Sequence, residues 1–154
     1  MKSKSENIMV KDFSRIIVPI DGSKESKKAA EKALSLAKKT GKEFVAMYVV
    51  DTPRLTETIP PNEASVAWES ILTKQGHTVL DEIEKKGKKI GVRVVKKLVE
   101  GIPEDEIVNE AKKNDIIVLA CEKKNIFDKL LIGSVCEEVI QKSSSEVMVY
   151  KMKK

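Results

Sequence analysis

The residues best suited to chemistry lie in one stretch, residues 116–134, which reads IIVLACEKKNIFDKLLIGS. An apolar run typical of a buried strand is followed by a polar loop, and Gly133-Ser134 then opens a predicted helix. A loop between a strand and a helix N-terminus can hold a phosphate group, because main-chain N–H groups and the helix dipole favour an anion there. The stretch therefore predicts a phosphate site.

The loop itself lacks the residue type that such a site usually needs. Main-chain N–H groups turn toward a phosphate most easily at positive φ, which glycine adopts without steric cost. The loop instead begins with four residues that carry side chains: Ala120, Cys121, Glu122 and Lys123. No glycine lies between Gly101 and Gly133. Turning the backbone inward would strain each side-chain-bearing residue by roughly 1–2 kcal/mol. The sequence therefore leaves open whether this site still binds a nucleotide.

A second candidate residue is Asp21, which ends the predicted buried strand RIIVPID. In open parallel sheets a ligand lies at the carboxyl ends of the strands, where the winding reverses. If strands 15–21 and 115–121 are neighbours, Asp21 and the Ala120 loop face one crevice. Asp21 then accepts a hydrogen bond from a ribose hydroxyl, or it forms an Asx-type turn with Gly22. The residue types alone leave both interpretations open.

Side chains for catalysis are few. His77 is the only histidine and falls within a predicted helix, which predicts an exposed or packing role. Cys121 and Cys136 lack Cys-x-x-Cys spacing and are predicted to be free and semi-buried, with pairing in space as the alternative. Glu122 and Asp128 could hold Mg²⁺ on a bound phosphate, or simply belong to a charged surface loop. We predict no enzyme, with a slow ATPase as the one enzymatic alternative.

The composition favours a single cytoplasmic domain. The chain has 154 residues, 29 basic and 24 acidic, with a formal charge of +5. It shows no membrane span and no signal peptide. We expect a flexible arm over residues 1–13 and one α/β domain over 14–152.

Lysines gather in one region: Lys85, Lys86, Lys88, Lys89, Lys96 and Lys97. Because no aromatic residues are interleaved with them, they predict a solvated face and no nucleic-acid partner.

Hydrophobic periodicity predicts alternating strands and helices. We expect strands over residues 15–21, 43–50, 92–99, 115–121 and 146–151. We expect helices over 24–40, 64–89 and 133–142 and another from Pro103. The helix over 64–89 should be weakened at Gly76 and should face inward through Trp68, Leu72, Val79 and Ile83. The helix over 133–142 should face inward through Val135, Val139 and Ile140. Residues 52–62 hold three prolines and predict a lid-type or disordered loop. The order predicts a doubly wound, Rossmann-like α/β domain, with helices on both faces of a parallel five-stranded sheet.

Three segments resemble the universal stress protein family: RIIVPIDGSKESKKAAEKALSLAKKTG, VEGIPEDEIVNEAKKNDIIVLA and LLIGSVCEEVIQKSSSEVMVYK. The resemblance extends from about residue 15 to residue 151. It implies the strand order 3-2-1-4-5 and a homodimer formed through the last strand, here with Val147 and Val149. An edge strand of this pattern suits such pairing. The resemblance also implies a role in stress response through an unknown protein partner.

Many members of that family bind ATP with the pattern Gly-x-x-Gly, nine residues, Gly-Ser/Thr. This sequence keeps the second half and the spacing, but Ala120 and Lys123 replace the two glycines. The resemblance places the candidate nucleotide-binding residues at Pro19, Asp21, Val49, Ala120, Lys123, Gly133, Ser134 and Val135. Members without the glycine pair do not bind ATP, so the resemblance implies weak or lost ATP binding. The alternative is an ATP or AMP switch, with Mg, that uses Gly133-Ser134.

Overall fold

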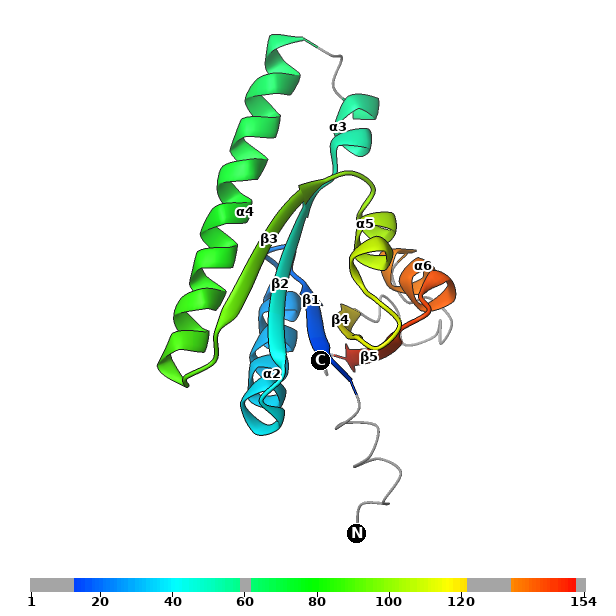
Figure 1. Cartoon of the computed structure of the whole chain (residues 1–154). Helices are drawn as coiled ribbons and strands as arrows, with labels where there is room; N and C mark the ends of the chain where they lie inside the picture. Colours follow the sequence, from blue (N-terminus) through cyan, green and yellow to red (C-terminus); the bar gives the residue numbers. More distant parts are fainter. Residues whose placement is uncertain (1–12, 59–61, 122–133, 152–154) are drawn as a thin grey trace.

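The sheet has five parallel strands in the order β3-β2-β1-β4-β5 (Figure 1). The computed structural model describes residues 13–58, 62–121 and 134–151. The strands are β1 (Arg15–Pro19), β2 (Glu43–Val50), β3 (Val94–Glu100), β4 (Ile116–Cys121) and β5 (Glu146–Lys151). The helices are α2 (Lys24–Thr40), α3 (Thr52–Thr58), α4 (Glu63–Lys89), α5 (Pro103–Glu110) and α6 (Ser134–Lys142). The predicted doubly wound α/β fold and its strand order are confirmed.

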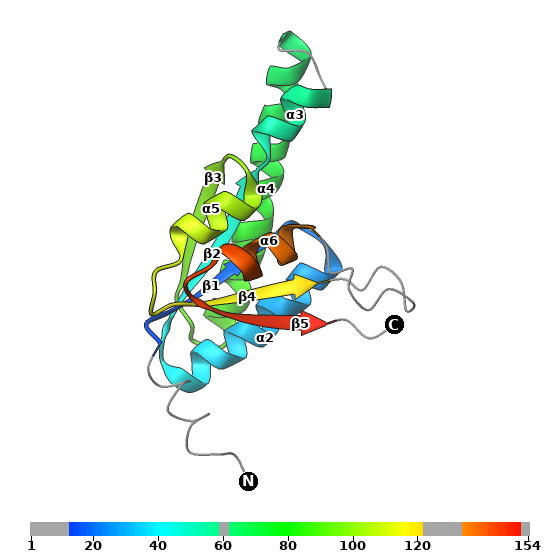
Figure 2. The same cartoon turned by 90° about the vertical axis from the view of Figure 1, so that its right-hand side faces the viewer.

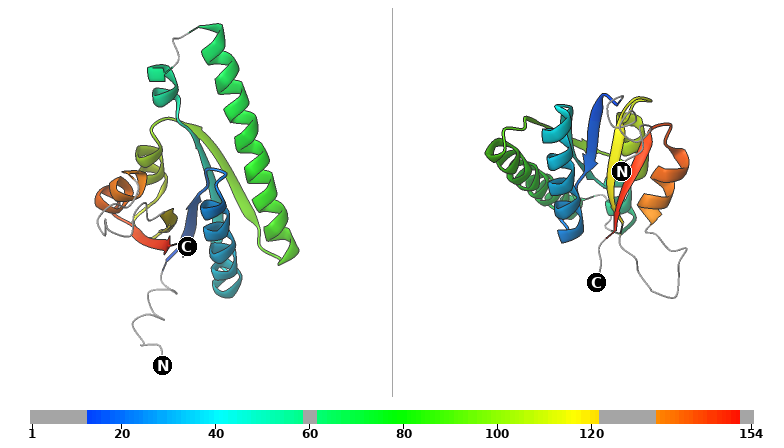
Figure 3. Two further views of the ribbon diagram at one scale, coloured as in Figure 1. Left: turned by 180° about the vertical axis from the view of Figure 1, so that it is seen from behind. Right: turned by 90° about the horizontal axis from the view of Figure 1, so that it is seen from below.

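Side chains of the strands alternate between two cores, one on each face of the sheet. Ile16 and Val18 of β1 pack with α2 and α4, whereas Ile17 packs with α5 and α6. The right-hand view of Figure 3 shows the helices on the two sides of the sheet. Because both faces are covered, the central strands are apolar at nearly every position, as parallel strands usually are.

Helix α2 follows the sequence prediction closely. Its inner face consists of residues that are each 2% exposed or less: Ala30, Ala33, Leu34 and Ala37. The Ser23 hydroxyl accepts a hydrogen bond from the Ser26 N–H at 3.1 Å and caps the helix. Gly41 ends the helix at φ 70°, a left-handed conformation that glycine adopts readily. The position of both ends therefore follows from local residue chemistry.

The predicted lid-type loop over residues 52–62 is wrong for its first part, because residues 52–58 form α3. Pro53 lies in the first turn, where the missing N–H removes no intrahelical hydrogen bond. The Asp51 carboxylate accepts a hydrogen bond from the Arg54 N–H at 3.0 Å and caps this helix. Residues 59–61 lie outside the described residues. A short, well-capped helix thus replaces most of the expected loop.

Helix α4 has 27 residues, or about 40 Å, and its amino-terminal half projects beyond the sheet (Figure 2). Near the start of that half, Val66 and Trp68 are 67% and 49% exposed. The prediction that Trp68 faces the interior is therefore wrong. Farther along the helix Ile83 is fully buried, and Leu72 and Val79 pack against the core while partly buried. The periodicity was correct only where the sheet supports the helix.

Two further residues differ from the sequence predictions. Gly76 does more than weaken α4: an added Cβ would lie 2.7 Å from a ring carbon of Tyr48 and 2.7 Å from a methyl carbon of Leu98. The glycine therefore permits a close approach of α4 to the sheet. Ile140 of α6 is 41% exposed, whereas Val139 is fully buried. Adjacent helical residues point about 100° apart, so both cannot face the same core.

The chain enters the core at Phe13, which is 5% exposed. The prediction that residue 13 belongs to a flexible arm is therefore wrong, and residues 1–12 lie outside the described part of the chain. No helix within the described ranges is long and apolar enough to cross a membrane.

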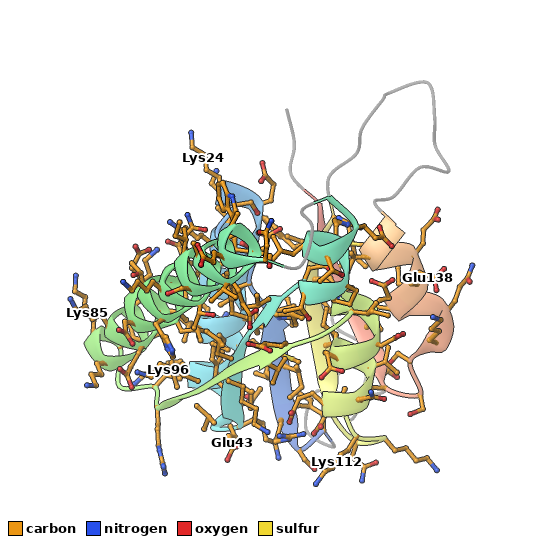
Figure 4. All side chains as sticks on the ribbon, turned by 90° about the horizontal axis from the view of Figure 1, so that it is seen from above. Lys24, Glu43, Lys85, Lys96, Lys112 and Glu138 are labelled. Carbon is orange, nitrogen blue, oxygen red and sulfur yellow. A yellow bond between two sulfur atoms is a disulfide. The ribbon has the colours of Figure 1, made fainter. Side chains whose placement is uncertain are left out.

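The lysine-rich region has the solvated character that the sequence predicts. Lys85 and Lys96 are labelled at the periphery of the molecule in Figure 4. Lys96 pairs with Asp81 at 2.9 Å and with Glu84 at 3.1 Å. Lys86 pairs with a carboxylate of α2. These lysines thus meet acidic neighbours or solvent.

Candidate functional site

A pocket of about 310 Å³ opens at the carboxyl ends of β1, β2 and β4. This is the point where the winding of the sheet reverses, because β1 lies between β2 and β4. Ligands of open α/β sheets usually bind at such a point, and ligand pockets usually span roughly 300–1,000 Å³. The pocket is therefore at the expected place and at the small end of the expected size.

The structure brings five of the eight predicted site residues to the walls of this pocket: Pro19, Asp21, Val49, Ala120 and Val135. Ser134 begins α6, but its side chain is not described. Lys123 and Gly133, together with Glu122 and Asp128, lie outside the described residues. The structure thus gathers the candidate residues of the strand ends and of α6 around one pocket, while most of the predicted phosphate loop, residues 122–133, lies outside the described residues.

Asp21 forms the Asx-type turn that was one of its two interpretations. Its Oδ1 atom accepts a hydrogen bond from the Ser23 N–H at 2.9 Å, and Gly22 between them has a φ of 87°. Burial raises the pKa of Asp21, but hydrogen bonds from Ser23 and Ser26 outweigh burial and hold the pKa below its ordinary value. The side chain is therefore an ionised acceptor at neutral pH. Its second interpretation, as an acceptor for a ribose hydroxyl, stays a prediction.

Sequence reasoning missed the part of the pocket wall that Asp51 and Arg54 form. Asp51 directly follows β2, as Asp21 closely follows β1, and both line the pocket. The Asp51 and Arg54 side chains form an ion pair at 3.5 Å. The rule that singled out Asp21, a polar residue at the carboxyl end of a strand, would also have found Asp51. Arg54 lies in α3, which the sequence did not predict, so no signal pointed to it.

The two cysteines are joined in a Cys121–Cys136 disulfide, with a Cα–Cα distance of 6.2 Å. The prediction of two free cysteines is therefore wrong, and the alternative of pairing in space is correct. Cys121 ends β4 and Cys136 lies in the first turn of α6, so the end of this strand and the start of this helix lie side by side. Sequence spacing could not reveal this proximity, because it depends on the tertiary placement of α6.

The pocket combines apolar walls with a few polar groups. Pro19, Val49 and Val135 offer surface suited to a flat ring system, while the Asp21 and Asp51 carboxylates offer acceptors. Among the described residues, no group of three or more His, Cys, Asp or Glu side chains could hold a metal ion. His77 is exposed on α4, as predicted, and is not among the residues that line this pocket. The arrangement is suited to binding a small, partly polar ligand.

Comparison with known proteins agrees with this architecture. The sequence profile of the Universal stress protein family matches residues 12–151. Universal stress protein MJ0531 of Methanocaldococcus jannaschii is 36% identical over 92% of this chain and 84% of its own length. The solved structure of MJ0577, from the same organism, aligns with a TM-score of 0.78 at 28% identity, over 92% of this chain and 98% of that one. A structure of a universal stress protein from Archaeoglobus fulgidus in complex with dAMP aligns with a TM-score of 0.62 at 19% identity, over 90% and 98%.

Proposed function

The chain belongs to the universal stress protein family, and we propose that it binds an adenine nucleotide weakly, chiefly through the nucleoside, and acts in stress response through a protein partner. The observation that carries this proposal is the pocket whose walls include Pro19, Asp21, Val49, Ala120 and Val135. The apolar side chains would pack against the base, and Asp21 would accept a hydrogen bond from the ribose. The relative that was solved in complex with dAMP supports the proposal, because it has the same fold and binds an adenine nucleotide.

Weak binding is proposed because the phosphate half of the motif lacks its two glycines. Ala120 belongs to β4 and pairs with Tyr150 of β5, so its backbone is that of an ordinary strand residue. None of the described non-glycine residues has a positive φ. Lys123 stands where the second glycine would be, and a side chain there occupies space that main-chain N–H groups need for a phosphate. Triphosphate contacts should therefore contribute little to binding.

The test is a calorimetric titration with Mg-ATP of the wild type and of the double variant Ala120→Gly/Lys123→Gly. We expect a wild-type Kd in the range of about 0.1–1 mM and tightening of about tenfold in the double variant, or about 1.4 kcal/mol. The matched control is Ala120→Gly alone, which should change affinity little because residue 120 already has ordinary strand geometry. No gain in the double variant would refute this account of the loop. Micromolar binding by the wild type would favour the alternative, an ATP or AMP switch with Mg that relies on Gly133-Ser134.

We further propose a cytoplasmic homodimer that pairs through β5. This strand is at an edge of the sheet, so one row of its N–H and C=O groups has no neighbouring strand within the described residues. Val147 and Val149 are half-buried and pack toward α5 and α6, and Met148 on the opposite side is 44% exposed. A second copy of β5 would extend the sheet and cover that exposed surface. Sedimentation equilibrium should give the mass of a dimer at micromolar protein, and a monomer mass up to about 100 μM would rule out this part of the proposal.

A further inference from the structure

We propose that Cys121 and Cys136 form a reversible dithiol–disulfide switch that sets the affinity of the pocket for its nucleotide. This inference rests on the proposed function, because it concerns the regulation of the same pocket. It assigns a role to the two cysteines, which are the only ones in the chain.

The disulfide lies next to two walls of the pocket. Ala120 and Val135 both line the pocket, and each is the residue immediately before one of the cysteines. Ala120 belongs to the sheet and Val135 to the first turn of α6. The covalent bond between the next residues therefore holds these two walls at a fixed separation.

Apart from the disulfide, few buried side chains hold the start of α6 in place. Val139 is fully buried in the core beneath α6, but Val135 is only partly buried and Ile140 is exposed. The amino-terminal end of this nine-residue helix thus depends on few buried side chains besides Cys136. Breaking the disulfide would leave the end that borders the pocket less restrained. A pocket that must be ordered on binding has lower affinity than one that is already ordered.

The pocket is the route by which a reducing thiol would approach the disulfide. Both cysteines are buried, with 3% and 7% of their surfaces exposed, but Cys136 is among the residues that line the open pocket, whereas Cys121 is not. A bound nucleotide would occupy the same route. In a reducing compartment, disulfides that do form are commonly transient and redox-sensing, which fits a cytoplasmic protein.

The reaction is thiol–disulfide exchange with a dithiol. A thiolate of the dithiol attacks the Cys136 sulfur, the Cys121–Cys136 bond breaks, and Cys121 leaves as a thiolate that takes up a proton. The second thiol of the reagent then attacks the mixed disulfide and releases Cys136 as a thiol. The reagent ends as a cyclic disulfide, and two electrons have passed from it to the protein. A small-molecule disulfide reverses the reaction and is itself reduced to two thiols.

The experiment titrates Mg-ATP into three samples: the oxidised wild type, the wild type reduced with dithiothreitol, and the double variant Cys121→Ser/Cys136→Ser. Thiol labelling followed by mass spectrometry establishes the redox state of each sample. We expect the oxidised form to bind at least threefold more tightly than the reduced form. The double variant should bind like the reduced form and should not respond to dithiothreitol.

A second measurement tests whether bound nucleotide changes the stability of the disulfide. If oxidation tightens nucleotide binding by a given factor, bound nucleotide must make the disulfide harder to reduce by the same factor. Equilibration in buffers of reduced and oxidised glutathione, with and without saturating Mg-ATP, should show that factor in the ratio of dithiol to disulfide protein.

The outcomes separate the two proposals. Equal affinity of the oxidised and reduced forms would overturn the switch and leave the proposed nucleotide binding intact. Absence of binding by both forms would overturn the proposed function and the switch together. Free thiols that persist in an excess of oxidised glutathione, a stronger oxidant than oxidised dithiothreitol, would overturn the switch alone, because no regulatory disulfide would then form.

Discussion

Arg15→Met is expected to lower the free energy of unfolding by about 3 kcal/mol. The Arg15 guanidinium donates to the Asp115 carboxylate at 2.7 Å from Nη2 and at 3.2 Å from Nε, and it also contacts Glu110. The Asp115 side chain is only 2% exposed. Methionine replaces the aliphatic stem of the arginine without its guanidinium, and leaves the carboxylate with one hydrogen bond from the described residues, that from the Lys112 N–H. Removing one partner of a buried ion pair usually costs about 3–5 kcal/mol, and partial exposure of Arg15 favours the lower end.

Urea unfolding at neutral pH measures this loss, because the Arg15 guanidinium is charged there, as every arginine is. The hydrogen bond to Asp115 raises the pKa of Arg15 still further. The matched control is Lys97→Met, which removes a cation that pairs with Glu110 at 2.8 Å while 38% exposed. An exposed pair of that kind contributes at most about 1 kcal/mol. Equal losses in the two variants would contradict the role assigned to the buried carboxylate.

The sheet and the helices beneath it were predictable because their burial is periodic. The run from Ile16 to Val18 is apolar at every position, as expected for a strand covered on both faces. The spacing from Ala30 to Ala37 places a single stripe of small residues on α2, and all of it is buried. In both cases the apolar pattern identifies the side chains that are buried. Few arrangements of strands and helices can bury all of them at once.

Prediction failed where burial depends on the lengths of neighbouring elements. Trp68 fits the helical stripe of α4 in the sequence but is 49% exposed near the start of the helix, whose amino-terminal part projects beyond the sheet. No sequence pattern states how far a helix extends past the sheet that it covers. Residues 52–58 were assigned to a loop because of the prolines around them. Pro53 is nevertheless compatible with the first turn of α3, and Asp51 supplies the cap. The number of prolines in a segment does not decide whether it is helical, because proline is tolerated in the first turn of a helix and disfavoured in its interior.

The pocket was half predictable for a related reason. Residues at the carboxyl ends of strands must gather at one edge of a parallel sheet, and this placed Asp21 and the Ala120 loop together, whereas Val49 was a candidate only through the family resemblance. The pairing of Cys121 with Cys136 instead depends on where α6 begins in space. Their separation of 15 residues is compatible with many distances, and only the fold reduces it to 6.2 Å between Cα atoms.

Gly87→Ala is expected to destabilise the protein by about 2 kcal/mol, against the usual preference of helices for alanine. In an open helix this change would stabilise by about 1 kcal/mol. Here an added Cβ would lie 2.6 Å from Cγ2 of Val94 and 2.7 Å from the carbonyl oxygen of Val92. The backbone of Val92 is held in place, since its N–H donates to the Gly87 carbonyl at 2.8 Å. Overpacking against atoms that cannot move away typically costs about 1–3 kcal/mol.

The control is Gly76→Ala, at a second position where α4 approaches the sheet. Its added Cβ would meet only side-chain atoms, 2.7 Å from Tyr48 and from Leu98, and these can rotate or shift. We therefore expect a smaller loss than at Gly87, measured for both variants as the midpoint and slope of urea unfolding. An increase in stability for Gly87→Ala would show that α4 does not approach the start of β3 so closely. A larger loss at Gly76 than at Gly87 would show that the side chains of Tyr48 and Leu98, rather than the backbone at Val92, set the limit on how closely this helix packs.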